Sequence, residues 1–243
     1  MRSQPLFIIG APRSGTTFLC CVLNRHPLIQ LTNECRSFVL LKGLIERSAV
    51  QPDLIGLEFQ QNFTAFVHRH AGELIERFYR EALGVTTPIW GDKHPPYADP
   101  TVLSGRDGSQ PRLPQSGSCL RLIRNSLRSA KFIHIQRDPV QVARSLVRKR
   151  WTPSFADGIN VWRQYVDEIA EFFAEIEPHQ QLTIMYRELL TEPEAVAESI
   201  GRFLNLPGWA EIEHFLLEQH RRPTPFSDPS TDLSIAYRES GVR

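Results

Sequence analysis

The chain has 243 residues, of which 41% are hydrophobic, and its formal net charge at pH 7 is +1. This length and hydrophobic content suffice for one sizeable core, so we expect a single domain over residues 1–243, with residues 220–243 as an irregular tail. The nearly neutral charge excludes a general electrostatic basis for nucleic-acid binding.

The start of the chain and its cysteines favour a cytoplasmic protein. A strand pattern begins within the first ten residues, without the charged, apolar and small-residue order of a signal peptide. No run approaches the roughly 18 apolar residues of a membrane span, so we expect no membrane association. The cysteines have neither metal-ligand spacing nor the density of a secreted disulfide scaffold, and we expect reduced, buried thiols. They are Cys20, Cys21, Cys35 and Cys119.

Strand and helix patterns alternate along the first half of the chain. Residues 5–10 form an apolar run that ends in glycine, which predicts a buried strand. The predicted segments that follow are a helix over 16–25 that ends at His26-Pro27, helices over 35–48 and 72–83, and a short strand over 88–92.

The second half continues this alternation after a loop over residues 104–118, which is rich in glycine, serine and proline. The further predicted segments are a core strand over 131–136, helices from Pro139 to about 150 and over 158–177, a strand over 181–186 and a helix over 193–204. Alternating strands and helices predict an α/β fold, with a central, mostly parallel sheet flanked by helices.

The turn after the first predicted strand has the spacing of a phosphate-binding loop. In nucleoside-triphosphate P-loops, G-x-x-x-x-G-K-[ST], the lysine reaches the β- and γ-phosphates. Gly10 and Gly15 keep this spacing, but Thr16 replaces the lysine and Arg13 places a cation inside the loop. Backbone N–H groups, hydroxyls and one cation at a helix start favour an anion, although an ordinary glycine-rich turn has the same glycines.

A second candidate anion site follows the strand predicted over residues 131–136. Arg137 comes directly after this strand, and Ser145 lies eight residues further on, within the predicted helix. Two helical turns bring both to one face, where an arginine fork and a hydroxyl can share one phosphate. On its own, Arg-Asp-Pro is also a common helix start.

Together these motifs resemble the sulfotransferase family that uses 3′-phosphoadenosine-5′-phosphosulfate (PAPS). G-A-P-R-S-G-T-T at residues 10–17 is similar to the family's phosphosulfate loop, and Q-R-D-P at 136–139 with Ser145 is similar to its 3′-phosphate site. A third likeness, to Y-x-x-L-x-x-x-P-E, begins at Tyr186. The resemblance spans roughly residues 5–207 and implies PAPS as the cosubstrate, adenosine 3′,5′-bisphosphate as the product, and no metal. The implied cofactor-binding residues are Arg13, Ser14, Gly15, Thr16, Thr17, Arg137, Ser145, Lys149, Tyr186 and Ser227.

Within this family the chain is most similar to tyrosylprotein sulfotransferases, in particular bacterial ones. They have arginine in the loop, as Arg13 here, and an acidic residue 21 positions later, as Glu34. They also have a lysine in a short D-P or T-P segment, and D-K-H-P at residues 92–95, which contains Lys93, is similar to it. The resemblance implies transfer of a sulfuryl group to tyrosine in a peptide or protein. Arg13 and Lys93 would stabilise the leaving oxygen, and Glu34 would take the phenol proton in a desolvated site. Arg36 would bind an acidic residue beside the tyrosine.

These residues leave alternatives open. Glu34 could be the exposed acidic start of the next helix, and Lys93 an exposed loop lysine. Arg36 could be a surface arginine, and Lys149 could complement the dipole at a helix end. Tyr186 and Ser227 rest on the alignment alone.

The acceptor and the class of activity also have alternatives. The acceptor could be a small phenol, carbohydrate or lipid hydroxyl, in a pocket formed by loops such as 58–70 and 104–118. An ATP-dependent kinase is disfavoured by Thr16 in the lysine position, and a non-catalytic nucleotide-binding protein is the remaining alternative. A homodimer is left open.

Other conspicuous side chains have simpler explanations. His68, His70 and His134 lack partner ligands in the sequence, so we expect no metal site. Four aromatic residues fall on one face of the helix predicted over 158–177 and are expected in the core. They are Trp162, Tyr165, Phe172 and Phe173.

Overall fold

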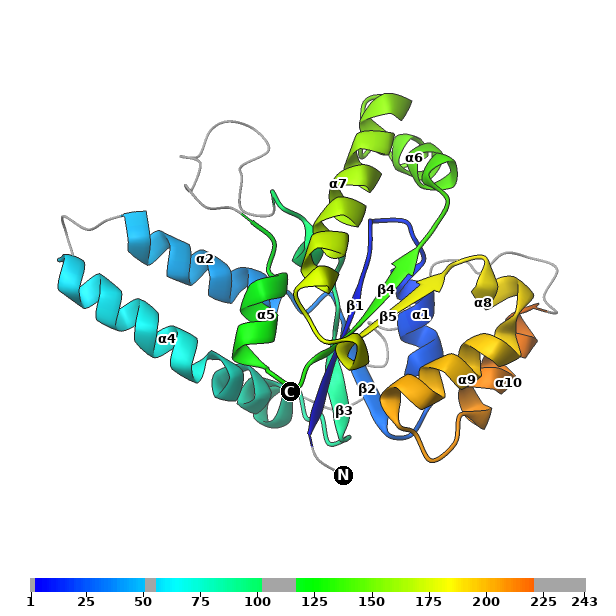
Figure 1. Ribbon diagram of the computed structural model, residues 1–243, viewed down its shortest axis with the longest axis horizontal. Coiled ribbons are helices and arrows are strands. Elements are labelled where there is room, and N and C mark those ends of the chain that lie inside the picture. Colours follow the sequence, from blue (N-terminus) through cyan, green and yellow to red (C-terminus); the bar gives the residue numbers. More distant parts are fainter. Residues whose placement is uncertain (1–2, 51–55, 102–116, 221–243) are drawn as a thin grey trace.

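A five-stranded parallel sheet forms the centre of the computed structural model, which describes residues 3–50, 56–101 and 117–220 (Figure 1). Its strand order is β2-β3-β1-β4-β5. The strands are β1 (Gln4–Ile9), β2 (Ile29–Asn33), β3 (Ile89–Lys93), β4 (Lys131–Gln136) and β5 (Gln181–Met185). All four neighbouring pairs run parallel, which confirms the predicted α/β class.

Helices cover both faces of this sheet (Figure 1). One face carries α2 (Ser37–Val50), α4 (Leu57–Arg77), α5 (Leu120–Ser126) and α7 (Phe155–Ala174). The other face carries α1 (Thr16–Leu23), α8 (Glu188–Thr191), α9 (Pro193–Leu204) and α10 (Ala210–His220). Helix α6 (Pro139–Arg148) packs against α7. A short π-helix, η1 (Phe78–Ala82), follows α4, and η2 (Pro95–Ala98) and η3 (Pro178–Gln180) are short 3₁₀ helices.

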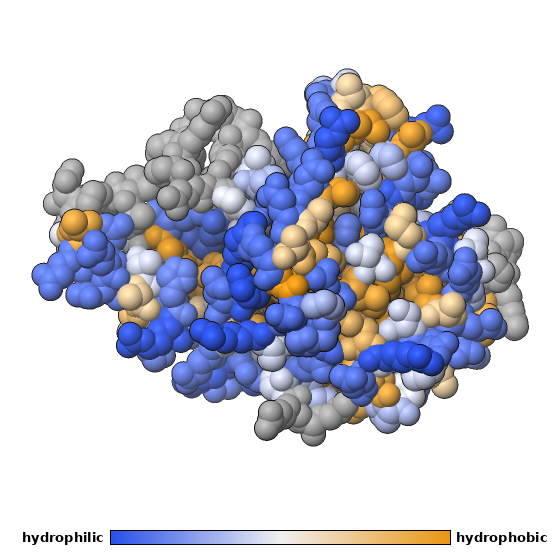
Figure 2. All heavy atoms as spheres, in the orientation of Figure 1, coloured by the Kyte–Doolittle hydropathy of each residue, from blue (hydrophilic) through white to orange (hydrophobic). Residues whose placement is uncertain are grey.

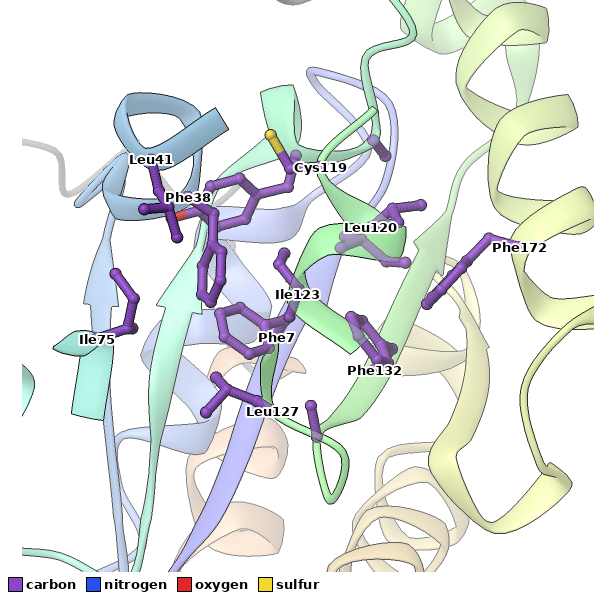
Figure 3. Close-up of a cluster of buried hydrophobic side chains, with 14 of the residues drawn as sticks. Phe7, Phe38, Leu41, Ile75, Cys119, Leu120, Ile123, Leu127, Phe132 and Phe172 are labelled. Carbon is purple, nitrogen blue, oxygen red and sulfur yellow. The ribbon is translucent and has the colours of Figure 1, made fainter. Parts of the chain in front are cut away.

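The central strand β1 is buried on both faces, as expected for a parallel sheet covered by helices. Leu6 and Ile8 belong to the cluster under α1, α9 and α10, whereas Phe7 belongs to the opposite cluster. Figure 3 shows this second cluster, in which the Phe7 ring meets Phe38 of α2 and Phe132 of β4, with ring centroids 5.7 and 5.9 Å away. The two clusters hold β1 rigidly, and with it the loop that follows.

The topology changes direction beside β1. The chain leaving β1 crosses to β2 at one edge of the sheet, whereas the chain leaving β4 continues to β5 at the other edge. In open α/β sheets, ligands bind outside the carboxyl ends of the strands at such a switch point. The loops after β1 and β4 are therefore placed to form one site.

Several segment predictions are confirmed and others are wrong. Helix α9 matches residues 193–204 in full, but the strand β2 and the helices α5 and α10 were not predicted. The expected acceptor loop at 58–70 is wrong, because these residues belong to α4. Its early turns expose large side chains such as Phe59 and Phe66, so the core periodicity that predicts a helix begins only near Val67. The loop predicted over 104–118 lies outside the described residues except at its last two positions.

The predicted core positions of the four aromatic side chains on α7 are confirmed. Tyr165 and Phe172 are buried, and Trp162 and Phe173 are partly buried and pack against the same cluster. The four cysteines are thiols that form no disulfide with one another; Cys20 and Cys119 are buried, whereas Cys21 and Cys35 are only half-buried, so the expectation of burial was wrong for these two. Within residues 3–50, 56–101 and 117–220, no cluster of histidine, cysteine and carboxylate side chains could hold a metal ion, and no helix has the length and apolar character needed to span a membrane.

Burial of His134 in β4 predicts a pH dependence of stability. Burial lowers the pKa of His134 from 6.5 to about 4. Between these values the unfolded chain binds a proton at His134 that the folded chain does not. The free energy of unfolding therefore keeps its full contribution from neutral His134 above pH 6.5 and loses it as the pH falls towards 4. At pH 5 the loss should be about 2 kcal/mol. We expect His134→Gln to lose about 2 kcal/mol less than wild type between pH 7.5 and pH 5, measured as free energy of unfolding in urea; equal losses would contradict this.

Candidate active site

The predicted site residues that the structure describes gather at the carboxyl edge of the sheet. The phosphosulfate-like loop follows β1, Glu34 and Arg36 follow β2, and Lys93 is the last residue of β3. Arg137 follows β4, with Ser145 and Lys149 on and just beyond α6, and Tyr186 follows β5. Ser227 lies outside the described residues. The fold thus brings together side chains from all five strand ends, although they span much of the chain.

Both loop glycines are required by close approach. Gly10 has φ 154°, and a Cβ atom there would lie 2.5 Å from the carbonyl oxygen of Ile135 in β4. Gly15 has φ 99°, and its Cβ would lie 2.3 Å from the ring of Tyr186. A side chain at either position would push the loop away from β4 or from Tyr186. These glycines therefore hold the loop against the segments that follow β4 and β5.

The loop leaves donors that an anion would satisfy. Helix α1 begins directly after Gly15, and no side chain in the described part of the chain caps it; the first four N–H groups of any α-helix lack intrahelical partners. Ser14 is 1% exposed, and its Oγ has no hydrogen-bond partner among the described residues. Thr16 is buried and Thr17 half-buried at the same helix start. An uncapped helix start beside an orphaned hydroxyl fits a bound phosphate or sulfate group.

The two anion motifs form one cluster. Arg13 adopts a left-handed backbone conformation with φ 72°, and its Nε donates a hydrogen bond to Ser145 Oγ at 3.1 Å. Arg137 donates from Nη1 to the Arg13 carbonyl oxygen at 3.3 Å. The Arg137 guanidinium also lies 4.4 Å from the ring centroid of Tyr186, which itself covers Gly15. Hydrogen bonds therefore join two cations and a hydroxyl from the segments that follow β1 and β4.

Lys149 stands at the end of the helix that carries this cluster. It caps α6, and its backbone N–H donates to the carbonyl oxygen of Ser145, four residues earlier. Its side chain is exposed. The spacing puts Lys149 on the Ser145 side of α6, a position that suits either a phosphate contact or the helix dipole.

Lys93 and Glu34 form an ion pair at the ends of β3 and β2. Lys93 Nζ donates to Glu34 Oε1 at 2.9 Å, and the Lys93 side chain is 2% exposed whereas that of Glu34 is 44% exposed. A buried lysine of this kind is rarely left without a charged partner. Lys93 is thus no exposed loop lysine, and Glu34, which precedes α2 in a left-handed conformation with φ 64°, does not start that helix. The desolvation expected around Glu34 is not provided by the described residues.

The turn that carries Glu34 and Arg36 is fixed by a buried carboxylate. Asp92 accepts hydrogen bonds from Thr32 Oγ1 at 2.8 Å, from the Cys35 N–H at 3.2 Å and from Tyr97 Oη at 2.8 Å. Burial raises the pKa of Asp92 above its usual 3.8, and these three hydrogen bonds act in the opposite direction. Sequence reasoning missed this role. The available signal was an acidic residue directly after the apolar residues Ile89 and Trp90 and Gly91 of β3.

His94 is a second residue that sequence reasoning missed. It is 3% exposed, and its Nδ1 lacks a hydrogen-bond partner within the part of the chain that the structure describes. Burial lowers the pKa of His94 from 6.5 to about 4; the charge of Glu34 raises it, and those of Arg36 and Lys93 lower it. His94 is therefore a neutral imidazole at pH 7 beside the Glu34–Lys93 pair. The charge of exposed Arg36 acts on the pKa of His94, so Arg36 lies near the same ion pair.

The fold and the candidate site define an α/β protein with a P-loop-like turn, in which Thr16 stands at the usual lysine position and Arg13 supplies the cation. Residues 5–211 match the model of the sulfotransferase family, and the chain belongs to that family. The matched segment begins just before the loop and ends at the start of α10, so it contains every described site residue.

Two curated proteins show the sequence relationship. A protein-tyrosine sulfotransferase of Drosophila melanogaster is 24% identical over 246 residues, which cover 96% of this chain and 45% of that protein. An uncharacterized protein of Aquifex aeolicus is 23% identical over 235 residues, covering 93% of this chain and 28% of the other. The chain therefore spans less than half the length of these relatives.

Solved structures agree with the fold. A sulfotransferase domain from the curacin biosynthetic pathway superposes with a TM-score of 0.60 at 18% identity, and the match covers 99% of both chains. A mouse sulfotransferase complexed with PAP superposes with a TM-score of 0.51 at 16% identity, covering 100% of this chain and 78% of that one. These similarities show that the chain has the sulfotransferase fold.

Proposed function

We propose that this protein transfers the sulfuryl group of PAPS to a hydroxyl group. The observation that carries the proposal is the cluster of Arg13, Arg137 and Ser145. It joins the phosphate-binding loop to a second set of anion ligands, and a nucleotide with anionic groups at both its 5′ and 3′ positions needs both. Membership of the sulfotransferase family and the PAP complex of the mouse structure support this ligand.

The residues around the loop suit the chemistry. PAPS supplies an activated sulfuryl group, whose transfer, by analogy with phosphoryl transfer, depends on positioning and charge stabilisation more than on covalent help. Arg13, held in the loop, neutralises charge on the departing oxygen. Lys93 adds a point charge, and its burial strengthens that effect because solvent does not screen it.

Glu34 is the proposed general base. Its half-exposed carboxylate is open to an incoming hydroxyl, whereas its partner Lys93 is buried beneath it. The proton of the acceptor hydroxyl passes to the Glu34 carboxylate as the oxygen attacks sulfur. Asp92 keeps this carboxylate in place through the Cys35 N–H.

We propose tyrosine in a peptide or protein as the acceptor. The support is the Drosophila relative together with the arrangement of Glu34 and Arg36, which lie two residues apart on one turn, both exposed and both with positive φ. Such a turn can present a base to a phenol and a guanidinium to an acidic neighbour of that tyrosine.

Arg36 should therefore govern the recognition of acidic peptides. We expect Arg36→Ala to raise KM for a tyrosine peptide with flanking glutamates by about tenfold, roughly one charge-assisted contact, with kcat within about twofold of wild type. KM for a simple phenol should not change. An equal rise in KM for both acceptors, or none for the peptide, would remove Arg36 from the acceptor site.

Nucleotide binding tests the proposed function directly. Calorimetric titration should show that adenosine 3′,5′-bisphosphate binds at least about tenfold more tightly than adenosine 5′-monophosphate, because Arg137 and Ser145 add a second phosphate site. Tight Mg-ATP binding without affinity for the bisphosphate would indicate a kinase. Bisphosphate binding without turnover on any acceptor would indicate a non-catalytic nucleotide-binding protein.

A further inference from the structure

Trp151 is a large apolar side chain that the core does not use. It follows α6 and is 57% exposed, beside the partly exposed Val147 of α6 and Phe155 of α7 (36% and 45%). Figure 2 shows apolar surface at the tip formed by α6 and α7. No motif in the sequence assigns this tryptophan a role.

The backbone nevertheless holds Trp151 in a defined place. The Trp151 N–H donates to the Leu146 carbonyl oxygen at 3.0 Å, and the Arg150 N–H to that of Val147 at 2.8 Å. This pair of hydrogen bonds is a Schellman motif, which normally has glycine in its left-handed position. Here Arg150 occupies that position with φ 58°, at a conformational cost for a non-glycine residue. The helix end therefore turns Trp151 back along α6.

The indole meets Arg13. The Arg13 guanidinium carbon lies 5.7 Å from the Trp151 ring centroid, within the range of a cation–π interaction. The same side chain donates from Nε to Ser145 Oγ, and Ser145 is buried on α6. Two groups of the α6 segment, one within the helix and one just past its end, thus hold the arginine of the loop.

The contact between Arg13 and Ser145 determines which hydrogen-bond donors this cluster can offer to an anion. Because Ser145 Oγ accepts from Arg13, its own O–H remains able to donate to a phosphate oxygen. A guanidinium has five N–H donors, of which the hydrogen bond to Ser145 uses one, and its planar fork is suited to pair with anion oxygens. Keeping Arg13 against Ser145 therefore joins the two halves of the anion site.

We propose that Trp151 is a positioning residue that holds Arg13 in the anion site through its indole face, so that Arg13 and Ser145 bind the nucleotide as one unit. The proposal rests on the proposed function and adds to it a residue that none of the motifs contains. Trp151 acts through Arg13, so its effect depends on the arginine being present.

Calorimetric titration with adenosine 3′,5′-bisphosphate tests this role in a double-mutant cycle. Trp151→Ala should weaken binding by about three- to tenfold, and Trp151→Phe, which keeps an aromatic face, should restore most of the affinity. In an Arg13→Gln background, Trp151→Ala should have no further effect. Phe66→Ala removes an aromatic side chain of α4 that is equally exposed, at 59%, and should bind as wild type does.

Each outcome has a separate meaning. Additive losses in the double variant, or a Trp151→Phe variant no better than Trp151→Ala, would overturn the positioning role. Wild-type affinity in Trp151→Ala would overturn it too. Absence of bisphosphate binding by the wild-type protein would instead contradict the proposed function. Melting temperatures of all variants show whether each is folded before its affinity is compared.

Discussion

Replacement of Arg13 by alanine should lower kcat for sulfuryl transfer by about 100- to 1000-fold, the usual effect of removing one preorganised group that stabilises transition-state charge. Arg13 is the cation inside the loop, and its contacts with Ser145 and Arg137 fix its position. Arg13→Lys should recover only part of the rate, because a lysine keeps the charge but not the planar fork. Initial rates at saturating PAPS and acceptor measure the effect.

A control separates this effect from general loss of positive charge. Arg128 is exposed and lies just before β4, at the amino edge of the sheet, on the side opposite the site. Arg128→Ala should keep the wild-type kcat. If Arg13→Ala also keeps the wild-type rate, Arg13 takes no part in the transfer and the proposed site is wrong.

Replacement of Glu34 by glutamine should lower kcat by about 100-fold or more, because an amide is not a proton acceptor. The amide of the introduced glutamine still offers an oxygen to Lys93 Nζ, so the buried cation keeps a hydrogen-bond partner. Affinity for adenosine 3′,5′-bisphosphate should therefore stay within about twofold of wild type. The effect should lie in kcat, measured at saturating concentrations of both substrates.

Alanine at the same position separates catalysis from stability. Glu34→Ala leaves Lys93 buried without its carboxylate, which should cost about 1 to 3 kcal/mol of stability. Glu34→Gln should melt close to wild type and still be slow. A Glu34→Gln variant that transfers sulfate at the wild-type rate would show that another group takes the proton.

The sequence predicted the α/β class because β1 contains the apolar run Leu6–Ile9 and β4 contains Phe132, Ile133 and Ile135, and each strand is followed by a helix. The loop that carries Arg13 and the position of Arg137 were predicted from the same two segments, because the loops after parallel strands meet at one edge of the sheet. β2 was missed because it is short, follows His26-Pro27 closely and contains only two aliphatic residues, Ile29 and Leu31. Its place at the sheet edge depends on pairing with β3, which is distant in the sequence.

The contacts between site residues could not be predicted in this way. Nothing local shows that Lys93 is buried, because that depends on how β3 packs between β1 and β2. Asp92 has the same origin, since its three donors come from β2, the following turn and η2. Trp151 has a role only through a loop far earlier in the chain. The spacing of residues along the sequence predicts which of them belong to the site, whereas the fold determines which of them are in contact.

Transfer of label from sulfate-labelled PAPS tests the central claim most directly. The acceptors are a tyrosine peptide with acidic flanks, the same peptide with tyrosine replaced by phenylalanine, and simple phenols, each incubated with wild-type protein. We predict label on the tyrosine peptide, none on the phenylalanine control, and less on the phenols. Label on the phenols alone would support the proposed sulfotransferase activity but contradict the proposed peptide acceptor. Absence of label on every acceptor of a broad hydroxyl panel, by a folded protein that binds adenosine 3′,5′-bisphosphate, would contradict the proposed activity.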